Sequence, residues 1–227
     1  DAVATSLLSK RWLYLWKLVP RLEYLTAWDK SGSDFIGNFL RLSMAPVLET
    51  FHLKLGYKCP PEELEKWVNT AVARHVRVLE LLHDRFRLRP MLCPKSLFAC
   101  KGLVVLRLQD VSVCDIPSTI SLQSLKTLSL VRVRFFSQDE LVHRLLSACP
   151  ILETLIIRRW FKDTVVSFTI AVPTLQNLHI MRRPDGHVVE DGDYVINTPS
   201  LKTLNFSDKF GRVRSLVKMP KLVKAEI

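Results

Sequence analysis

The chain has 227 residues, 48% of them apolar and 24% charged, and a formal net charge of +11. A chain of this length buries roughly 70% of the surface that it exposes when unfolded, which is enough for one solid core. No apolar run reaches the ~18–20 residues of a membrane helix. The sequence shows no signal peptide. It also lacks a glycine-rich phosphate-binding loop, which argues against a nucleotide-binding fold.

The N-terminal segment predicts short helices. Apolar residues between Val3 and Val19 recur at steps of three to five, as on an amphipathic helix or on two short helices that end before Pro20. Ser33 and Asp34 are then expected to cap a helix that leads into the first repeat, with Phe35, Ile36, Phe39 and Leu40 on its apolar side.

From Leu48 onward one phrase returns eight times: an apolar residue, two variable residues, Leu or an equivalent, one variable residue, and another apolar residue. Successive copies start 21 to 28 residues apart, which is the range of leucine-rich repeats. The copies start at Leu48, Val76, Leu103, Leu125, Leu152, Leu175, Leu201 and Leu222. Such units bury their apolar faces only by stacking on one another. The sequence therefore predicts an α/β leucine-rich-repeat solenoid of about eight repeats, with a parallel sheet on one face.

Each copy reads as a short strand. Five copies have a proline two residues before their first apolar residue, a place where the chain enters a strand and no ladder donor is needed. Alternate strand residues then point to the core, and those between them face solvent. We select as candidate partner-binding residues these outward positions: His52, Arg107, Ser129, Thr154, Asn177, His179 and Asn205.

The segments between the copies are expected to cross the other face. Pro60–Glu63 is a helix start, with proline in the first turn and acids near the positive end of the dipole. Ser137–Glu140 is a capping box for a second helix. Val165–Ile170 is a candidate back strand, and the polar stretch from Arg183 to Asp193 is expected to be a loop.

The basic residues are expected in these connecting segments, whereas the outward ladder is mostly neutral. The connecting basic residues are Arg85, Arg87, Arg89, Arg132, Arg134, Arg158, Arg159, Lys162, Arg182, Arg183, Arg212 and Arg214. A phosphate-binding groove would place such residues on the sheet. This distribution favours a solvated rim or a patch for an acidic protein over a nucleic-acid-binding solenoid, which stays as the less favoured alternative.

No residue pattern indicates catalysis. The six histidines are dispersed without metal-ligand spacing, and no hydrolase or metalloprotease motif is present. The five cysteines include no C-x-x-C pair, as expected of reduced thiols in the cytoplasm or nucleus. We predict a non-enzymatic protein that needs no cofactor or metal.

The stretch A-V-A-T-S-L-L-S-K-R-W-L-Y-L-W resembles the C-terminal half of a plant F-box. The remainder resembles the plant F-box/LRR family that often carries a C-terminal FBD domain. Phrases of that family include W-V-N-T-A-V-A at 67–73, L-L-S-A-C-P-I-L-E-T-L at 145–155 and N-T-P-S-L-K-T-L at 197–204. The resemblance divides the chain into an F-box remnant, residues 1–25, and a repeat domain, residues 26–227. It also implies that the helix opening the family's F-box is missing and that an FBD domain would lie beyond Ile227.

The resemblance implies a substrate receptor of an SCF ubiquitin ligase, in which the F-box docks on a Skp-type adaptor next to a cullin and the repeats hold an unknown protein substrate. It gives adaptor contacts or F-box packing to Leu8, Trp12, Leu15 and Trp16. Packing of the two tryptophans against the first repeat is an equally consistent interpretation. A repeat scaffold that binds no adaptor is the main alternative.

Overall fold

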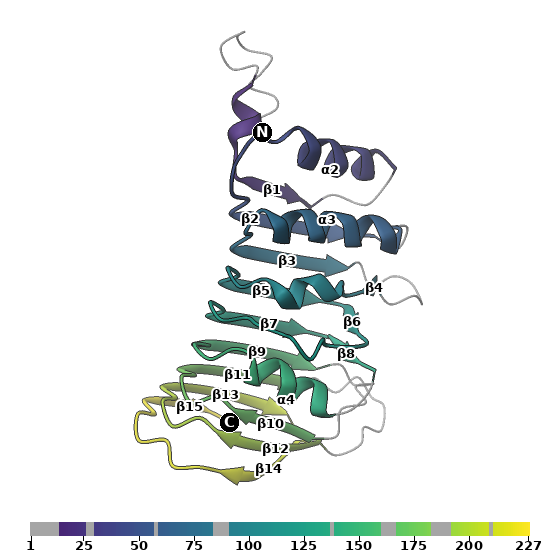
Figure 1. The fold of residues 1–227 in the computed structure, drawn as a ribbon. Helices are drawn as coiled ribbons and strands as arrows, with labels where there is room; N and C mark the ends of the chain where they lie inside the picture. Colours follow the sequence, from purple (N-terminus) through teal and green to yellow (C-terminus); the bar gives the residue numbers. More distant parts are fainter. Residues whose placement is uncertain are drawn as a thin grey trace.

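The computed structural model describes residues 14–25, 30–56, 59–83, 91–136, 139–159, 167–182, 192–208 and 211–227. Its central feature is a nine-stranded parallel sheet in the order β1-β2-β3-β5-β7-β9-β11-β13-β15. Figure 1 shows these strands stacked one beyond another from the N-terminal to the C-terminal end. The strands are β1 (Arg21–Tyr24), β2 (Thr50–Leu55), β3 (Val78–His83), β5 (Val105–Gln109), β7 (Thr127–Val131), β9 (Thr154–Arg159), β11 (Asn177–Arg182), β13 (Thr203–Asp208) and β15 (Lys224–Glu226).

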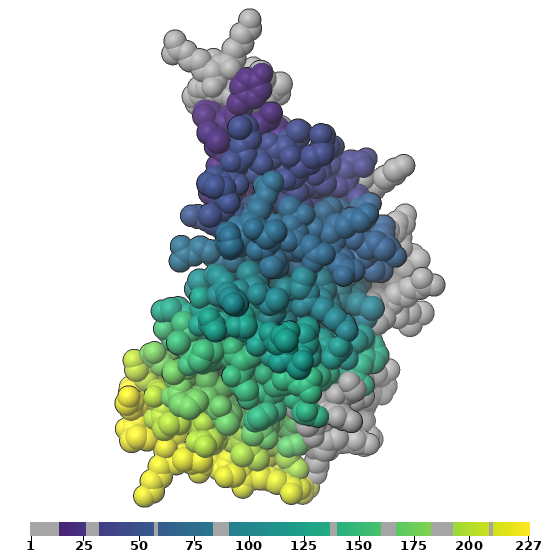
Figure 2. Space-filling view, viewed as in Figure 1, coloured from purple at the N-terminus to yellow at the C-terminus, as the bar shows by residue number. Residues whose placement is uncertain are grey.

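The segments between these strands cover the other side of the core. The helices of the described residues are the 3-10 helix η2 (Leu15–Leu18), which precedes β1, then α2 (Lys30–Leu42), α3 (Pro61–Ala73), the 3-10 helix η3 (Lys95–Ala99) and α4 (Asp139–Ser147). One small parallel sheet joins β4 (Met91–Leu92), β6 (Val111–Val113) and β8 (Arg134–Phe135). The other joins β10 (Ser167–Ala171), β12 (Gly192–Asn197) and β14 (Gly211–Leu216). Consecutive parts of the chain form consecutive slabs along the long axis (Figure 2). None of the described helices is long and apolar enough to cross a membrane.

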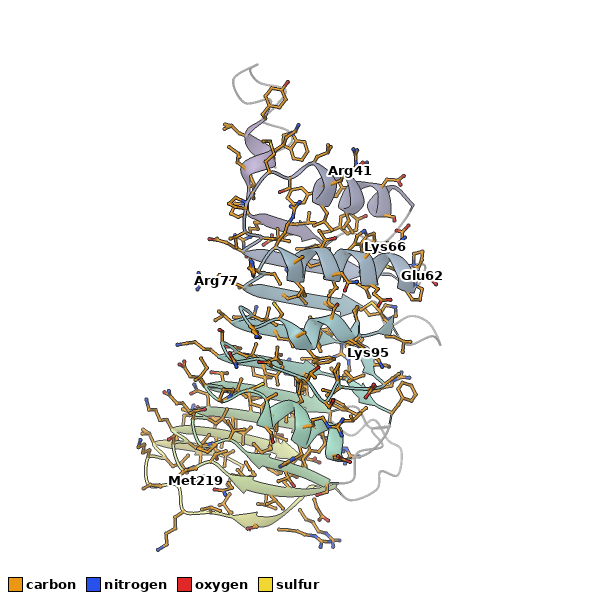
Figure 3. The ribbon with its side chains drawn as sticks, viewed as in Figure 1. Arg41, Glu62, Lys66, Arg77, Lys95 and Met219 are labelled. Atoms are coloured by element: carbon orange, nitrogen blue, oxygen red, sulfur yellow. The ribbon has the colours of Figure 1, made fainter. Side chains whose placement is uncertain are left out.

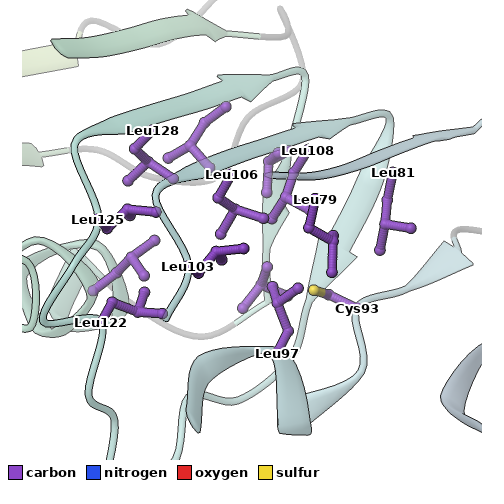
Figure 4. Packing of buried hydrophobic residues seen from close by; sticks show 14 of the residues in the cluster. Leu79, Leu81, Cys93, Leu97, Leu103, Leu106, Leu108, Leu122, Leu125 and Leu128 are labelled. Carbon is purple, nitrogen blue, oxygen red and sulfur yellow. The ribbon is translucent and has the colours of Figure 1, made fainter. Parts of the chain in front are cut away.

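The prediction that the repeats stack their inward leucines into one continuous core is confirmed. Leu79, Leu106 and Leu128 are register partners on successive strands, and all three are fully buried (Figure 4). The same row continues through Leu155 and Leu178. Each buried leucine contributes roughly 1.5–3 kcal/mol relative to an exposed one. Stacking these rows therefore drives the assembly of units that could not bury their apolar faces alone.

The sheet contains one strand more than the eight predicted copies. β1 pairs in parallel with β2 and places Leu22 beside Phe51. Its residues follow the expected helices that end before Pro20 and lie within the segment 1–25, which we assigned to the F-box remnant. Only η2 is helical among the described residues of that segment.

The helices lie where the sequence predicted them, but not all of them begin at the predicted residues. α3 begins at Pro61, within the predicted start Pro60–Glu63, and buries Leu64, Trp67, Val68 and Ala71. α2 begins at Lys30, so the prediction that Ser33 and Asp34 start that helix was wrong. Ser137 and Gln138 of the predicted capping box lie outside the described residues, but α4 follows directly and buries Leu141, Val142, Leu145 and Leu146.

The prediction that basic residues lie in connecting segments agrees with the structure for Arg132, Arg134, Arg212 and Arg214, which lie in the segments between main-sheet strands or in the back strands β8 and β14. It was wrong for Arg158, Arg159 and Arg182, which belong to β9 and β11 of the main sheet. The predicted Arg183–Asp193 loop was wrong at its end, since Gly192 and Asp193 begin β12. The basic residues from 85 to 89, Lys162 and Arg183 lie outside the described residues. Other charged side chains do lie at the rims, such as Arg77 and Lys95 on opposite sides of the stack (Figure 3).

Arg159, Tyr194 and Asp208 form a buried polar cluster where β9 and β13 meet the β10-β12-β14 sheet. The Arg159 Nη1 donates to the Tyr194 hydroxyl at 3.0 Å, and that hydroxyl donates to Asp208 Oδ2 at 2.7 Å. The Arg159 guanidinium also lies 4.5 Å from the centre of the Phe168 ring. Gly211 passes so close that a Cβ there would lie 2.6 Å from Tyr194 Cε2. The cluster therefore joins the main sheet to the back sheet through hydrogen bonds between buried side chains.

Candidate functional site

The outer face is the side of the nine-stranded sheet that points away from the core. Its side chains come from alternate strand positions, because a strand presents successive residues to opposite sides. The middle row of this face runs through register partners His52, Glu80, Arg107, Ser129, Ile156, His179, Asn205 and Glu226. The first row contains Thr154 and Asn177, which are also register partners. All seven predicted outward residues therefore lie on this one face.

Six of the seven are partly or well exposed, whereas Ser129 is buried at 6% relative exposure. Its register partners are Arg107 on one side and Ile156 on the other. Because both neighbours are much longer than serine, they cover it. The prediction that Ser129 is available to a partner was wrong for this reason.

In the N-terminal part of the outer face, charged and polar side chains contact one another. Glu80 lies between His52 and Arg107 on neighbouring strands. Its Oε2 is 3.3 Å from His52 Nε2, and its Oε1 forms an ion pair with Arg107. With only 14% of its side chain exposed, this carboxylate is already neutralised within the sheet. A ligand would have to displace these contacts to reach it.

The C-terminal part of the outer face forms a shallow groove of about 420 Å³ across β9, β11, β13 and β15. Uncharged side chains are hydrogen bonded across its strands. Asn177 Nδ2 donates to Thr154 Oγ1 at 3.2 Å, and Thr203 Oγ1 donates to Asn177 Oδ1 at 2.7 Å. Four of the seven predicted residues line this C-terminal groove: Thr154, Asn177, His179 and Asn205.

His179 lies in the floor of the groove. Its Nε2 is shielded from solvent and has no hydrogen-bond partner among the described residues. Partial burial lowers the pKa of His179 first, and the positive charge of Arg158 lowers it further, while Glu226 acts in the opposite direction. The imidazole is therefore neutral at pH 7. It provides a polar ring without adding charge to the groove.

The far edge of the groove contains the only carboxylate among its lining residues, Glu226. Asn205 Nδ2 donates to its Oε2 at 2.5 Å, and Lys224 Nζ lies 2.6 Å from its Oε1. The contacts with Lys224, foremost, and with Asn205 lower the pKa of Glu226. The carboxylate is therefore ionised and paired at neutral pH.

A larger hollow, about 580 Å³, lies at the C-terminal end of the stack. It is lined mainly by core side chains such as Leu204, Phe206 and Ile196, together with exposed Leu216 and Ile227. These apolar residues lie in or directly after the last described strands of the stack. The polar side chains that line the hollow are Ser207 and Asp208, and the Asp208 carboxylate already accepts from Tyr194.

The four predicted F-box residues are only partly placed. Leu8 and Trp12 lie outside the described residues, whereas Leu15 and Trp16 belong to η2. Trp16 packs against Phe39 of α2 with ring centroids 6.2 Å apart. Leu15 is 50% exposed. The structure therefore places Trp16 in the packing against the solenoid and Leu15 at the surface.

Leu15 belongs to an N-terminal apolar patch, which we define as exposed Tyr14, Leu15, Leu18 and Met44. The backbone N–H of Met44 donates to the carbonyl of Lys17 at 2.7 Å, which holds the two segments together. The sequence pattern identified Leu15 but gave no signal for Met44, which lies between α2 and β2. Exposed apolar side chains gathered in this way are typical of a protein contact.

Two residues of the groove were missed as candidates. Arg158 was assigned to a connecting segment, but it points outward from β9 into the groove. Ile156 also lines the groove from an outward position of β9, and we did not select it as a candidate. No sequence signal singled it out, because a β-branched residue is ordinary in a strand. Among the described residues, no group of three or more His, Cys, Asp or Glu could hold a metal ion.

Comparison with known proteins agrees with this geometry. Residues 64–224 match the family model for the LRR repeats of FBD-associated F-box protein At5g56370. The chain is 40% identical to that protein of Arabidopsis thaliana, over all of this chain and 53% of the relative. It is 46% identical to another FBD-associated F-box protein from the same plant, At5g56440, over 99% of this chain and 54% of the relative.

The F-box/LRR-repeat protein At3g26922 of Arabidopsis thaliana is 40% identical over all of this chain and 75% of its own length. The chain spans about half the length of the other two relatives. No solved structure matches it significantly. With a leucine-rich-repeat stack and this extent of identity, the chain belongs to the plant F-box/FBD/LRR-repeat family.

Proposed function

We propose that the protein is the substrate-recognition subunit of an SCF-type ubiquitin ligase and acts in the cytoplasm or nucleus. Its relatives are named as F-box proteins, a description that implies interaction with other proteins. The main support for this proposal is the outer face of the sheet. It presents hydrogen-bonding side chains in register over neighbouring strands, and few of them are charged. Such a surface suits the recognition of a folded or extended protein segment.

The proposal gives the two ends of the chain different tasks. The N-terminal apolar patch, with Leu8 and Trp12 before it in sequence, would contact a Skp-type adaptor beside a cullin. The groove would hold the target protein. The chain would perform no chemistry itself, because tethering alone raises the effective concentration of target lysines near the transferring enzyme. Because the two tasks use separate surfaces, adaptor binding and target binding can be tested by separate mutations.

The experiment uses the full-length protein, co-expressed with a Skp-type adaptor. The wild type should co-purify with the adaptor, and a Trp12→Ala, Leu15→Ala double variant should lose it. The outer-face variant Asn177→Arg should keep the adaptor, because it lies far along the stack from η2. Conversely, the Asn177→Arg variant should lose target proteins that the Trp12→Ala, Leu15→Ala variant still retains.

Other outcomes would favour the alternatives. A wild-type protein that never retains the adaptor, yet binds proteins through the groove, would be a repeat scaffold. Binding to duplex or single-stranded nucleic acid that falls steeply with salt would indicate a phosphate-contacting surface. Either result would contradict the receptor proposal.

A further inference from the structure

One cation in the groove has no counter-charge. Arg158 points outward from β9, and its register partners are the uncharged Val131 and Met181. Within the described part of the chain, no carboxylate lies within ion-pair distance of its guanidinium. The nearest acid of the groove, Glu226, already contacts Lys224 and Asn205. Arg158 is therefore exposed, charged and available.

The surroundings of Arg158 differ from those of Arg107, another outward arginine on the sheet. Arg107 lies on the same face but is neutralised by Glu80. In the groove, by contrast, the other lining groups are hydroxyls, amides, the His179 imidazole, the paired Lys224 and Glu226, and the partly buried Ile156. A guanidinium bound to a carboxylate in such a setting forms charge-assisted hydrogen bonds, which are stronger than neutral ones.

We propose that the groove binds a segment of the partner protein that carries an Asp or Glu side chain, with its carboxylate held by Arg158. The uncharged ladder of Thr154, Asn177 and Thr203 would contact the polar groups next to that side chain, and Ile156 an aliphatic neighbour. A volume of about 420 Å³ lies in the lower part of the ~300–1,000 Å³ range of ligand pockets, enough for a short segment. The inference rests on the proposed use of this face for partner binding.

A nucleic acid fits the same cation less well. Binding to phosphates draws its strength from several lysines and arginines that act together along the backbone. The groove offers Arg158 and the paired Lys224. The next unpaired cation on the outer face, Lys54, lies on β2, four strands away from β9 in the sheet. One accessible cation among hydrogen-bonding groups matches a single carboxylate better than a row of phosphates.

The test is a selection of random 12-residue peptides displayed on phage against the immobilised full chain. Peptides selected by the wild type should share an Asp or Glu, and that enrichment should vanish with Arg158→Gln. For one selected peptide, Arg158→Gln should weaken binding by about tenfold or more, as expected for a hydrogen bond to a charged group. Replacing the peptide's Asp with Asn should have a similar effect, and the two changes together should add little.

Lys54→Gln is the matched control, because it removes an exposed cation from the same face far from the groove. It should leave peptide affinity within about twofold, the size of an ordinary surface effect. A His179 resonance gives a readout independent of affinity. An acidic peptide that neutralises Arg158 should raise the pKa of His179, and the Asn version of the peptide should not. The groups facing this ring are Arg158 and Ile156 on β9, Asn205 on β13, and Lys224 and Glu226 on β15.

The remaining outcomes distinguish a failure of the Arg158 inference from a failure of the groove as a binding surface. Peptides that lose affinity with Asn177→Arg but show no acidic preference would overturn the role of Arg158 and leave the outer face as a binding surface. A selection that yields no peptide dependent on Asn177 or Arg158 would overturn both the inference and the use of this groove. Equal losses from Lys54→Gln and Arg158→Gln would show a general charge effect and would also overturn the inference.

Discussion

The buried polar cluster gives the sharpest stability prediction. Tyr194 is fully buried, and its hydroxyl both accepts from Arg159 and donates to Asp208. Burial foremost raises the pKa of Tyr194, so the hydroxyl keeps its proton at neutral pH and remains a donor. Tyr194→Phe keeps the ring but removes this bridge. It leaves a buried guanidinium and a buried carboxylate each with one contact fewer.

Each unsatisfied buried polar group costs about 1–3 kcal/mol, so we expect Tyr194→Phe to lower the free energy of unfolding by about 2 kcal/mol. For a chain of 150–250 residues this corresponds to a fall in Tm of about 4–8 °C. The assay is urea unfolding at pH 7 followed by circular dichroism. Tyr14→Phe is the control, because Tyr14 is 62% exposed and such surface changes stay within about 0.5 kcal/mol.

The same side chain predicts a pH effect. A raised folded-state pKa means that the stabilisation is complete below the unfolded tyrosine pKa of about 10 and is lost as the pH rises above it. The wild type should therefore lose more stability between pH 9 and 11 than Tyr194→Phe does. A Tyr194→Phe protein as stable as the wild type at pH 7, with the same alkaline profile, would refute the role assigned to this cluster.

Three further predictions concern single sites. Gly211→Ala should destabilise by about 1–3 kcal/mol in urea unfolding, since a Cβ would meet Tyr194 and Asp208; an unchanged midpoint would contradict the close approach. Under native conditions Cys114 should react first with a thiol reagent, because it is exposed, whereas burial raises the pKa of Cys93 and Cys149 to about 12; rapid labelling of Cys93, mapped by mass spectrometry, would oppose this. Because the pKa of His179 is lowered in the folded state, its contribution to stability is complete above the unfolded pKa of about 6.5 and is lost as the pH falls. His179→Gln should therefore reduce the loss of unfolding free energy between pH 7 and 5, and a pH profile identical to that of the wild type would count against this.

Most of the sheet was predictable because leucine and proline repeat with the period of the units. The ninth strand was missed for an identifiable reason. Val19, Leu22 and Tyr24 fit the repeat phrase, but Val19 also continues the helical spacing of Leu15 and Trp16, and an aromatic residue occupies the third position. Two patterns overlap on the same residues, and only tertiary pairing with β2 decides between them.

The buried arginines could not be predicted from composition, since arginine is rarely buried unless it is paired. Their alternation was nevertheless visible. Arg159 follows Leu155 and Ile157 at steps of two, so it faces the same side of β9 as they do. The sequence could not show which residues would pair with Arg159. Tyr194 and Asp208 lie on other strands, and their hydrogen bonds with Arg159 and with each other form only when β12 and β13 stack beside it. Ser129 illustrates the reverse case, in which the side was predicted and the cover by longer neighbours was not.

All functional proposals depend on adjacent repeats stacking in register. Oxidative cross-linking tests this directly, because a disulfide requires Cα atoms roughly 4.4–6.8 Å apart and adjacent strands lie about 4.8 Å apart. A Thr154→Cys, Asn177→Cys protein should form the cross-link between β9 and β11, detected by mass spectrometry of the linked peptides. Thr154→Cys with Thr203→Cys, two strands apart in the sheet, should not. Absence of the first cross-link, or equal yield of the second, would contradict the stacked solenoid and the face built upon it.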